Sequence, residues 1–192
     1  MAVEEGQGRR EALGLAVLRL LATRGMDAIS YGAVASEAGV SKGLVQHYFP
    51  ERLQLIDCAS QVLAQRMAAR LAGAFAGRRA EASESELFRV LAGMLPVDDE
   101  ARMDAAAGRA LFCLALSDAE ANARYRQGRR AALDLIRSLV AKQRPGVSPA
   151  VAEQVARDLL GTAAQLGEDL LLGELTPRKA RALLRHRCSF VS

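Results

Sequence analysis

The spacing of hydrophobic residues predicts a chain made of helices. Leu13, Val17 and Leu20 recur three or four positions apart, which places them on one face of a helix. Similar spacing continues along the chain, and glycine, proline or a capping residue marks most of the breaks. The predicted helices span residues 10–24, 31–38, 42–49, 51–76, 84–95, 101–116, 118–142, 148–172 and 176–190. The pattern therefore predicts an all-α protein with about nine helices.

Two of the predicted helices, the second and third, are short and closely spaced. Ser30 and Ser41 precede them, and a serine at this position can cap a helix by accepting a hydrogen bond from a backbone N–H in its first turn. Gly39 ends the first of the two, and Pro50 follows the second. This layout is that of a helix-turn-helix, although helix-glycine-helix corners also occur in all-α proteins with other functions.

The residues in and after this motif sharpen the interpretation. The segment at 33–56 reads AVASEAGVSKGLVQHYFPERLQLI, with Ala38-Gly39-Val40-Ser41, Tyr48-Phe49 and a basic residue three positions after the phenylalanine. It resembles the N-terminal DNA-binding domain of the TetR/AcrR family of bacterial transcriptional regulators. The resemblance implies an N-terminal three-helix bundle with a helix-turn-helix over 1–52, followed by a larger helical effector-binding and dimerisation domain over 53–192. It further implies a repressor that binds a palindromic operator on double-stranded DNA as a homodimer and is released by an unknown small-molecule effector.

The third predicted helix supplies the candidates for reading DNA bases. Val45 and Phe49 lie four positions apart and are expected to face the core, which leaves the opposite side to a major groove that admits one helix. On that side Gln46 can pair with an adenine edge, and Lys42 can donate to guanine or to a phosphate. The candidates for base reading are Lys42, Gly43, Leu44, Gln46 and His47. Gln46 stands where the family usually has tyrosine, so the operator of a relative does not transfer.

The phosphate contacts are implied by the resemblance. They fall on Ser30, Tyr31, Ser41, Tyr48 and Arg52. Each also has a structural alternative, since the serines can act as caps, Tyr48 can pack on the first helix, and charged residues can simply solvate their helices.

The rest of the chain resembles the family mainly in architecture, and its last two helices look like those of the BetI-like branch, without choline following as the ligand. The resemblance implies dimerisation through Leu159, Ala163, Leu166, Leu170, Ala180, Leu183 and Leu184. A candidate effector pocket comprises Met67, Phe88, Leu91, Phe112, Cys113, Leu116 and Tyr125. At such spacings plain core packing is the more common role.

The charge distribution weakens one argument for DNA binding. The net charge is +4 and the pI is about 9.3, values that favour nucleic acid as a partner. Residues 1–52, however, contain six basic and six acidic side chains, so the predicted DNA-binding domain is neutral. DNA binding is therefore inferred from the motif, and a modest dependence on salt is expected.

Other classes of protein find less support. Three cysteines and two histidines show no metal-ligand spacing, and no nucleophile-base pair or glycine-rich phosphate loop is visible, so neither an enzyme nor a cofactor is expected. The longest apolar run has seven residues, far from the ~20 of a membrane span, and no signal peptide is evident, which favours the cytoplasm. A helical protein-interaction scaffold without sequence-specific DNA binding remains the alternative.

Overall fold

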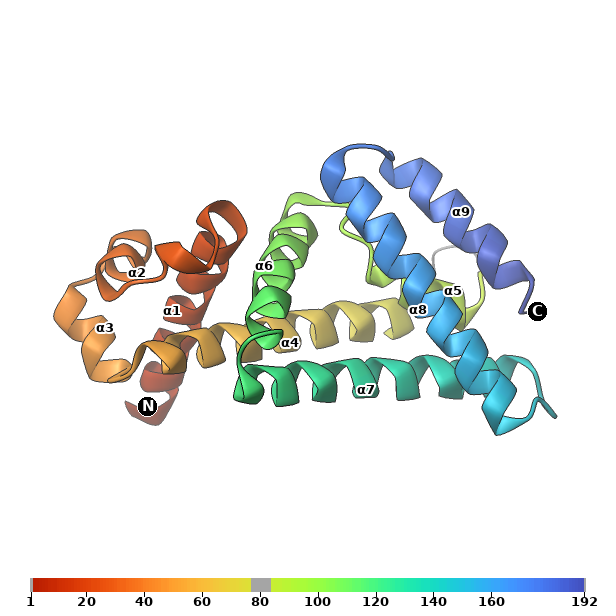
Figure 1. The fold of residues 1–192 in the computed structure, drawn as a ribbon, viewed down its shortest axis with the longest axis horizontal. Coiled ribbons are helices and arrows are strands. Elements are labelled where there is room, and N and C mark those ends of the chain that lie inside the picture. Colours follow the sequence, from red (N-terminus) through yellow and green to blue (C-terminus); the bar gives the residue numbers. More distant parts are fainter. Residues whose placement is uncertain (1, 77–83, 192) are drawn as a thin grey trace. The chain divides into compact units, whose positions relative to one another are not determined.

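The structure is a computed structural model that describes residues 2–76 and 84–191, with nine α-helices and one short 3-10 turn in these ranges and no strand (Figure 1). The all-α prediction is confirmed. The helices are α1 (Ala2–Arg24), α2 (Tyr31–Ala38), α3 (Lys42–Tyr48), α4 (Arg52–Ala76), α5 (Glu86–Gly93), α6 (Asp99–Ala115), α7 (Ala119–Gln143), α8 (Pro149–Leu172) and α9 (Pro177–Ser189), and the turn η1 is Met26–Ala28. No helix in the described ranges is long and apolar enough to cross a bilayer.

The first helix is longer than predicted. It begins at Ala2, eight residues before the expected start at residue 10. The side chains from Gln7 to Ala12 are exposed, so these turns carry none of the apolar periodicity on which the prediction relied. The other helix ends lie within two residues of the predicted positions.

The chain divides into two compact units. The first unit combines the residues up to Arg66 with Arg102–Tyr125, and the second combines Met67–Ala101 with the residues from Arg126 onwards. Helices α4, α6 and α7 therefore each contribute to both units. The predicted division at 52/53 concerns which residues bind DNA and which bind a ligand, and it stays a prediction.

The core of the first unit packs α1, α2, α3 and the start of α4 against one another. Leu13, Val17, Val34, Val45 and Phe49 are all buried there. At Gly14, α1 comes so close to α4 that a Cβ atom would lie 2.8 Å from Cγ2 of Val62. This close packing holds α4, the helix that follows the helix-turn-helix, against α1.

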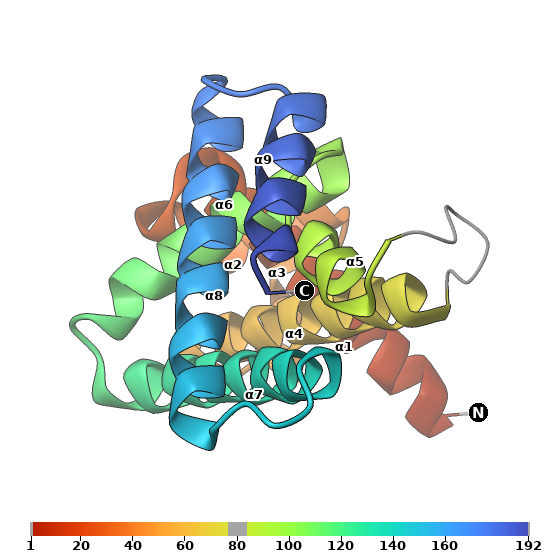
Figure 2. The same cartoon turned by 90° about the vertical axis from the view of Figure 1, so that its right-hand side faces the viewer.

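In the second unit α8 and α9 lie side by side and pack on α5 (Figure 2). The residues that fill this contact are all buried and include Phe88, Leu91, Leu159, Ala163, Leu166, Leu170, Ala180 and Leu184. Six of the seven residues expected at the dimer interface thus face the core of their own subunit, and only Leu183 is exposed. The spacing identified the apolar faces of α8 and α9 correctly, but it did not show that α5 covers them.

Candidate DNA-binding site

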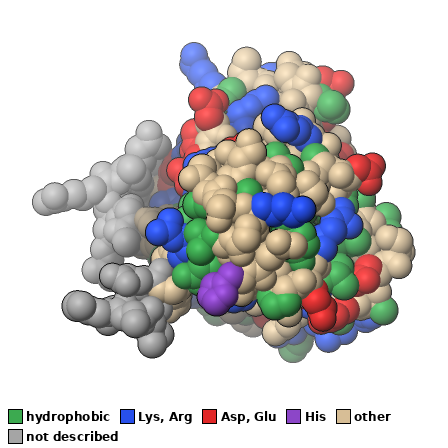
Figure 3. Space-filling view, turned by 90° about the vertical axis from the view of Figure 1, so that its left-hand side faces the viewer, with side chains coloured by type: hydrophobic (Ala, Val, Ile, Leu, Met, Phe, Trp, Pro, Cys, Tyr) green, Lys and Arg blue, Asp and Glu red, His purple; other side chains and the backbone are tan. Residues whose placement is uncertain are grey.

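Helix α3 presents the surface that the sequence predicted. Val45 and Phe49 are completely buried, and Lys42, Gly43, Gln46 and His47 are exposed. Leu44 is half-buried. Figure 3 views the end of the first unit that carries α2 and α3, where Lys and Arg side chains are scattered among uncharged groups rather than gathered in one patch. The orientation of α3 is confirmed, while the reading of bases by these side chains stays a prediction.

The turn between α2 and α3 is built by local interactions. Gly39 has a φ of 66°, the left-handed conformation that favours glycine at the end of a helix. The hydroxyl of Ser30 accepts a hydrogen bond from the N–H of Ala33, and that of Ser41 accepts one from the N–H of Leu44, both at 3.2 Å. The predicted caps are confirmed. Each serine accepts through its oxygen and so keeps its own O–H proton for a further acceptor such as a phosphate.

Two of the phosphate candidates donate to backbone carbonyls, Tyr31 to the loop after α3 and Arg52 to the segment between α1 and α2. The hydroxyl of Tyr31 donates to the carbonyl of Pro50 at 2.7 Å, and Arg52 donates from Nε to the carbonyl of Ile29 at 2.8 Å and from Nη2 to that of Met26 at 2.9 Å. A tyrosine has a single hydroxyl proton and a phosphate accepts only, so Tyr31 can bind a phosphate only by breaking its bond to Pro50. Arg52 has five N–H donors, and three stay available.

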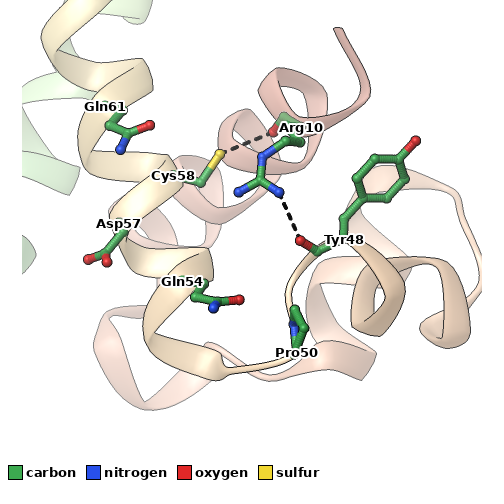
Figure 4. A pocket seen from close by; sticks show the side chains of 7 residues that line it. All are labelled: Arg10, Tyr48, Pro50, Gln54, Asp57, Cys58 and Gln61. Atoms are coloured by element: carbon green, nitrogen blue, oxygen red, sulfur yellow. Dashed lines mark hydrogen bonds between the residues drawn. The ribbon is translucent and has the colours of Figure 1, made fainter. Parts of the chain in front are cut away.

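The remaining phosphate candidate lies at the end of α3. Tyr48 is half-buried, and its ring lies edge-on to that of His47 with centroids 5.5 Å apart. Figure 4 shows the Tyr48 hydroxyl directed away from α4, so the side chain combines a packed ring with an outward-pointing donor.

Arg10 is a site residue that sequence reasoning missed. Its Nη1 donates to the carbonyl of Tyr48 at 2.9 Å, and its guanidinium carbon lies 4.5 Å from the centre of the Phe49 ring (Figure 4). The backbone carbonyl of Arg10 accepts the thiol proton of Cys58 at 3.3 Å, and burial raises the pKa of that thiol. The contact of Arg10 with Tyr48 joins residues 38 positions apart, and that with Cys58 joins residues 48 positions apart. No pattern of neighbouring residues in the sequence predicts them.

A hollow of about 360 Å³ lies beside the contacts of Arg10 with Tyr48 and Cys58. Its lining comes from α1, the end of α3 and α4, and consists of Arg10, Tyr48, Pro50, Gln54, Asp57, Cys58 and Gln61 (Figure 4). Asp57 pairs with Arg124 at 2.6 Å, yet the pKa of its carboxyl is raised because partial burial outweighs the attraction of the guanidinium.

The candidate effector residues fall into different environments. Phe88 and Leu91 are buried in the core of the second unit. Met67 is half-buried and belongs to the same unit, but not to that core. In the first unit Phe112 packs against Tyr125 with ring centroids 5.3 Å apart. Of the other two residues, both in this unit, Cys113 is exposed and Leu116 is 70% exposed. The effector pocket stays a prediction. Among the described residues no three His, Cys, Asp or Glu side chains are grouped so as to hold a metal ion.

The comparisons with known proteins agree with this geometry. Residues 16–59, which include the helix-turn-helix, match the family model described as "Bacterial regulatory proteins, tetR family". No curated protein matches the chain in sequence.

Several solved structures share the fold over nearly the whole chain. A transcriptional regulator from Rhodococcus sp. RHA1 superposes with a TM-score of 0.81 at 23% identity, covering 95% of each chain. A TetR-family transcriptional regulator from Streptomyces coelicolor gives 0.68 at 25% identity, covering 96% of this chain and 80% of its own. A Saccharomonospora viridis protein solved in complex with choline gives 0.76 at 18% identity, covering 93% of this chain and 94% of its own. Residues 16–59 thus match the tetR-family model, and the fold of the chain is shared with solved transcriptional regulators.

Proposed function

We propose that this protein is a transcriptional repressor of the TetR family that binds a palindromic operator as a homodimer and leaves it when a small molecule binds. The observation that carries the proposal is the exposed face of α3, where Lys42, Gly43, Gln46 and His47 lie on a helix that Ser41 caps. A surface helix of this kind fits the major groove, and its side chains can reach base edges there.

Gln46 is the side chain that we assign to base discrimination. Its amide can donate to and accept from an adenine edge at once, and such a bidentate contact is worth about 1–3 kcal/mol of discrimination. Gln46→Ala is expected to relax the preference at one base pair in each half-site when bound sequences are selected from random DNA. An unchanged selected sequence would show that Gln46 does not read a base.

We assign the phosphate contacts to Ser30, Ser41, Tyr48 and Arg52, each of which has a donor left over after its internal bonds. Tyr48→Phe removes only the hydroxyl, so it serves as the matched control for Gln46→Ala. It is expected to weaken binding to all sequences alike and to leave the salt dependence unchanged, because a neutral hydroxyl neutralises no phosphate charge. A change in sequence preference caused by Tyr48→Phe would contradict this division of roles.

The homodimer is proposed to form through the outer faces of α8 and α9, because α5 already covers their inner faces. Six large hydrophobic side chains are strongly exposed among the described residues, and four lie on or directly after these helices. They are Val151 at 49%, Leu172 at 73%, Leu183 at 42% and Phe190 at 67%. The exposed Gly161 and Ala164 leave room for a partner helix on the same stretch of α8.

Light scattering tests this interface. Leu183→Glu is expected to shift the measured mass from that of a dimer towards that of a monomer, because it places a charge in an apolar contact. Leu116→Glu is the control, since this leucine is equally apolar and more exposed but lies in the first unit. A dimer that survives Leu183→Glu and dissociates with Leu116→Glu would place the interface elsewhere.

The effector is proposed on the strength of the shared fold, since the Saccharomonospora viridis protein of that fold holds choline. The chain has only eight aromatic residues, none of them tryptophan, and so offers few members for an aromatic cage around a quaternary ammonium. A screen of small molecules, choline included, against the operator complex tests this part. Release of DNA by one compound at a saturable concentration is the expected result, and a complex indifferent to a broad screen would argue against effector control.

A further inference from the structure

The end of α3 is completed by a side chain from α1. Tyr48 is the last residue of α3, and its carbonyl is one of the four that a helix leaves without a partner within the helix. Nη1 of Arg10 donates to this carbonyl at 2.9 Å. The positive charge of the guanidinium also lies at the negative end of the helix dipole, where a cation is favourable.

The same guanidinium contacts the next residue. It lies over the ring of Phe49, 4.5 Å from the ring centre, and this ring is completely buried in the core of the first unit. Arg10 therefore holds α3 by the backbone of one residue and the ring of the next. A side chain with two contacts of different kinds is restricted in both position and orientation.

Arg10 is itself fixed against α4. Its backbone carbonyl accepts the thiol proton of Cys58, and one turn further along α1 the close approach at Gly14 leaves no space between the two helices. The loop after α3 is held from the other side, because Tyr31 donates to the carbonyl of Pro50. The end of α3 is thus tied to α1 and, through Arg10, to α4 (Figure 4).

We propose that Arg10 is a positioning residue for DNA recognition, which sets the placement of α3 through Tyr48 and Phe49 without touching a base. The inference rests on the proposed function, in which α3 reads base edges. Helix α3 has only seven residues, so a displacement of its last turn moves its exposed side chains as well. The bidentate contact assigned to Gln46 needs two hydrogen bonds within about 2.7–3.2 Å, and a shift of α3 weakens that contact first.

Arg10→Met removes both interactions and keeps an apolar side chain of similar length. Arg9→Met is the matched control, because Arg9 is exposed on the same turn of α1 and loses the same charge. The measurement is the ratio of the affinity for the selected operator to that for an operator changed at the base pair assigned to Gln46. Arg10→Met is expected to lower this ratio by roughly tenfold while the salt dependence of binding stays as in the wild type. Arg9→Met is expected to leave the ratio unchanged.

Two conservative variants complete the series. Arg10→Lys keeps a charged donor and is expected to restore part of the lost discrimination. Arg10→Gln keeps an N–H donor without the charge or the full reach, and it replaces Arg10→Met where that variant does not fold, with the same expected direction.

Three results would overturn the inference. If Arg10→Met weakens all sequences equally and lowers the salt slope by about 0.9 for each phosphate that is no longer neutralised, Arg10 binds a phosphate instead. If it lowers only the melting temperature and leaves the affinity ratio intact below the transition, its role is general stability. If Arg9→Met lowers the ratio as much, the effect comes from charge on α1 and not from the interactions of Arg10 with α3.

Hydrogen exchange separates failure of this inference from failure of the proposed function. The amide of Phe49 donates to the carbonyl of Val45, and we expect it to exchange faster in Arg10→Met while the amides of α2 are unchanged. This readout requires no DNA, so it tests the interaction even where no operator is selected. Equal exchange at Phe49 in the wild type and in Arg10→Met would contradict the inference on its own.

Discussion

Gly14→Ala tests the close packing of α1 on α4 that supports the whole site. A Cβ atom at this position would lie 2.8 Å from Cγ2 of Val62 and 3.2 Å from Sγ of Cys58. A contact below 3.0 Å cannot persist, so one of the neighbours must move. Valine is restricted at χ1 in a helix, and the thiol of Cys58 is bonded to the carbonyl of Arg10, so neither moves easily.

Two opposing terms set the size of the effect. Replacing glycine by alanine inside a helix gains up to about 1 kcal/mol, because the unfolded chain has less freedom to lose. Inserting a methyl group into a tightly packed core costs about 1–3 kcal/mol. The expected result is a loss of about 0–2 kcal/mol in the free energy of unfolding.

Gly8→Ala is the matched control. It lies on the same helix with no atom within 4 Å of the added Cβ, so it isolates the gain from helix propensity. Urea denaturation followed by circular dichroism gives both values. The double variant Gly14→Ala/Val62→Ala is expected to recover part of the loss, because the methyl group then has room. If Gly14→Ala stabilises the protein as much as Gly8→Ala does, the helices are not closely packed and the reasoning about the α1–α4 junction is refuted.

Two further predictions concern titratable groups. Cys113 is exposed, whereas burial raises the pKa of the Cys58 thiol and raises that of Cys188 to about 11. An alkylating reagent at pH 8 is therefore expected to modify roughly one thiol per chain quickly. Rapid reaction at all three cysteines would contradict the burial of Cys58 and Cys188. Asp57 has a raised carboxyl pKa, so its ionisation opposes folding, and its contribution to stability falls as the pH rises above the ordinary aspartate pKa of about 4. Asp57→Asn is expected to reduce this loss of stability, measured by urea denaturation across the acid range. A pH profile identical to that of the wild type would show that Asp57 is not desolvated.

Much of the helix-turn-helix could be predicted because its determinants are local. Ser30 and Ser41 cap the helices that follow them, and Gly39 takes the left-handed conformation, all within four residues of the structures they define. Val45 and Phe49 are buried at the expected spacing, which also exposes Gln46. Patterns that involve residues only a few positions apart can be recognised in the amino-acid sequence alone.

The interactions that bring distant residues together could not be read in this way. Arg10 has the sequence context of a solvated surface residue, and only the fold brings it to Tyr48. Tyr31 and Arg52 resembled phosphate ligands, but the structure uses donors of both to hold backbone carbonyls.

The apolar faces of α8 and α9 present the same difficulty. Leu166 and Leu184 were correctly placed on apolar stripes, but a stripe looks the same whether its partner is α5 of the same subunit or a helix of another. Among the described residues, apolar side chains that stay exposed after folding, such as Leu183 and Phe190, are the candidates for the proposed dimer contact.

Selection of bound sequences from random double-stranded DNA tests the central claim most directly. The wild-type protein is expected to enrich a palindrome whose half-sites lie about 34–36 Å apart, one helical turn or a multiple of it, and Gln46→Ala is expected to lose one conserved base pair in each half. Enrichment of no sequence, with no salt-dependent retention on DNA, would contradict the account and favour a helical scaffold that binds proteins.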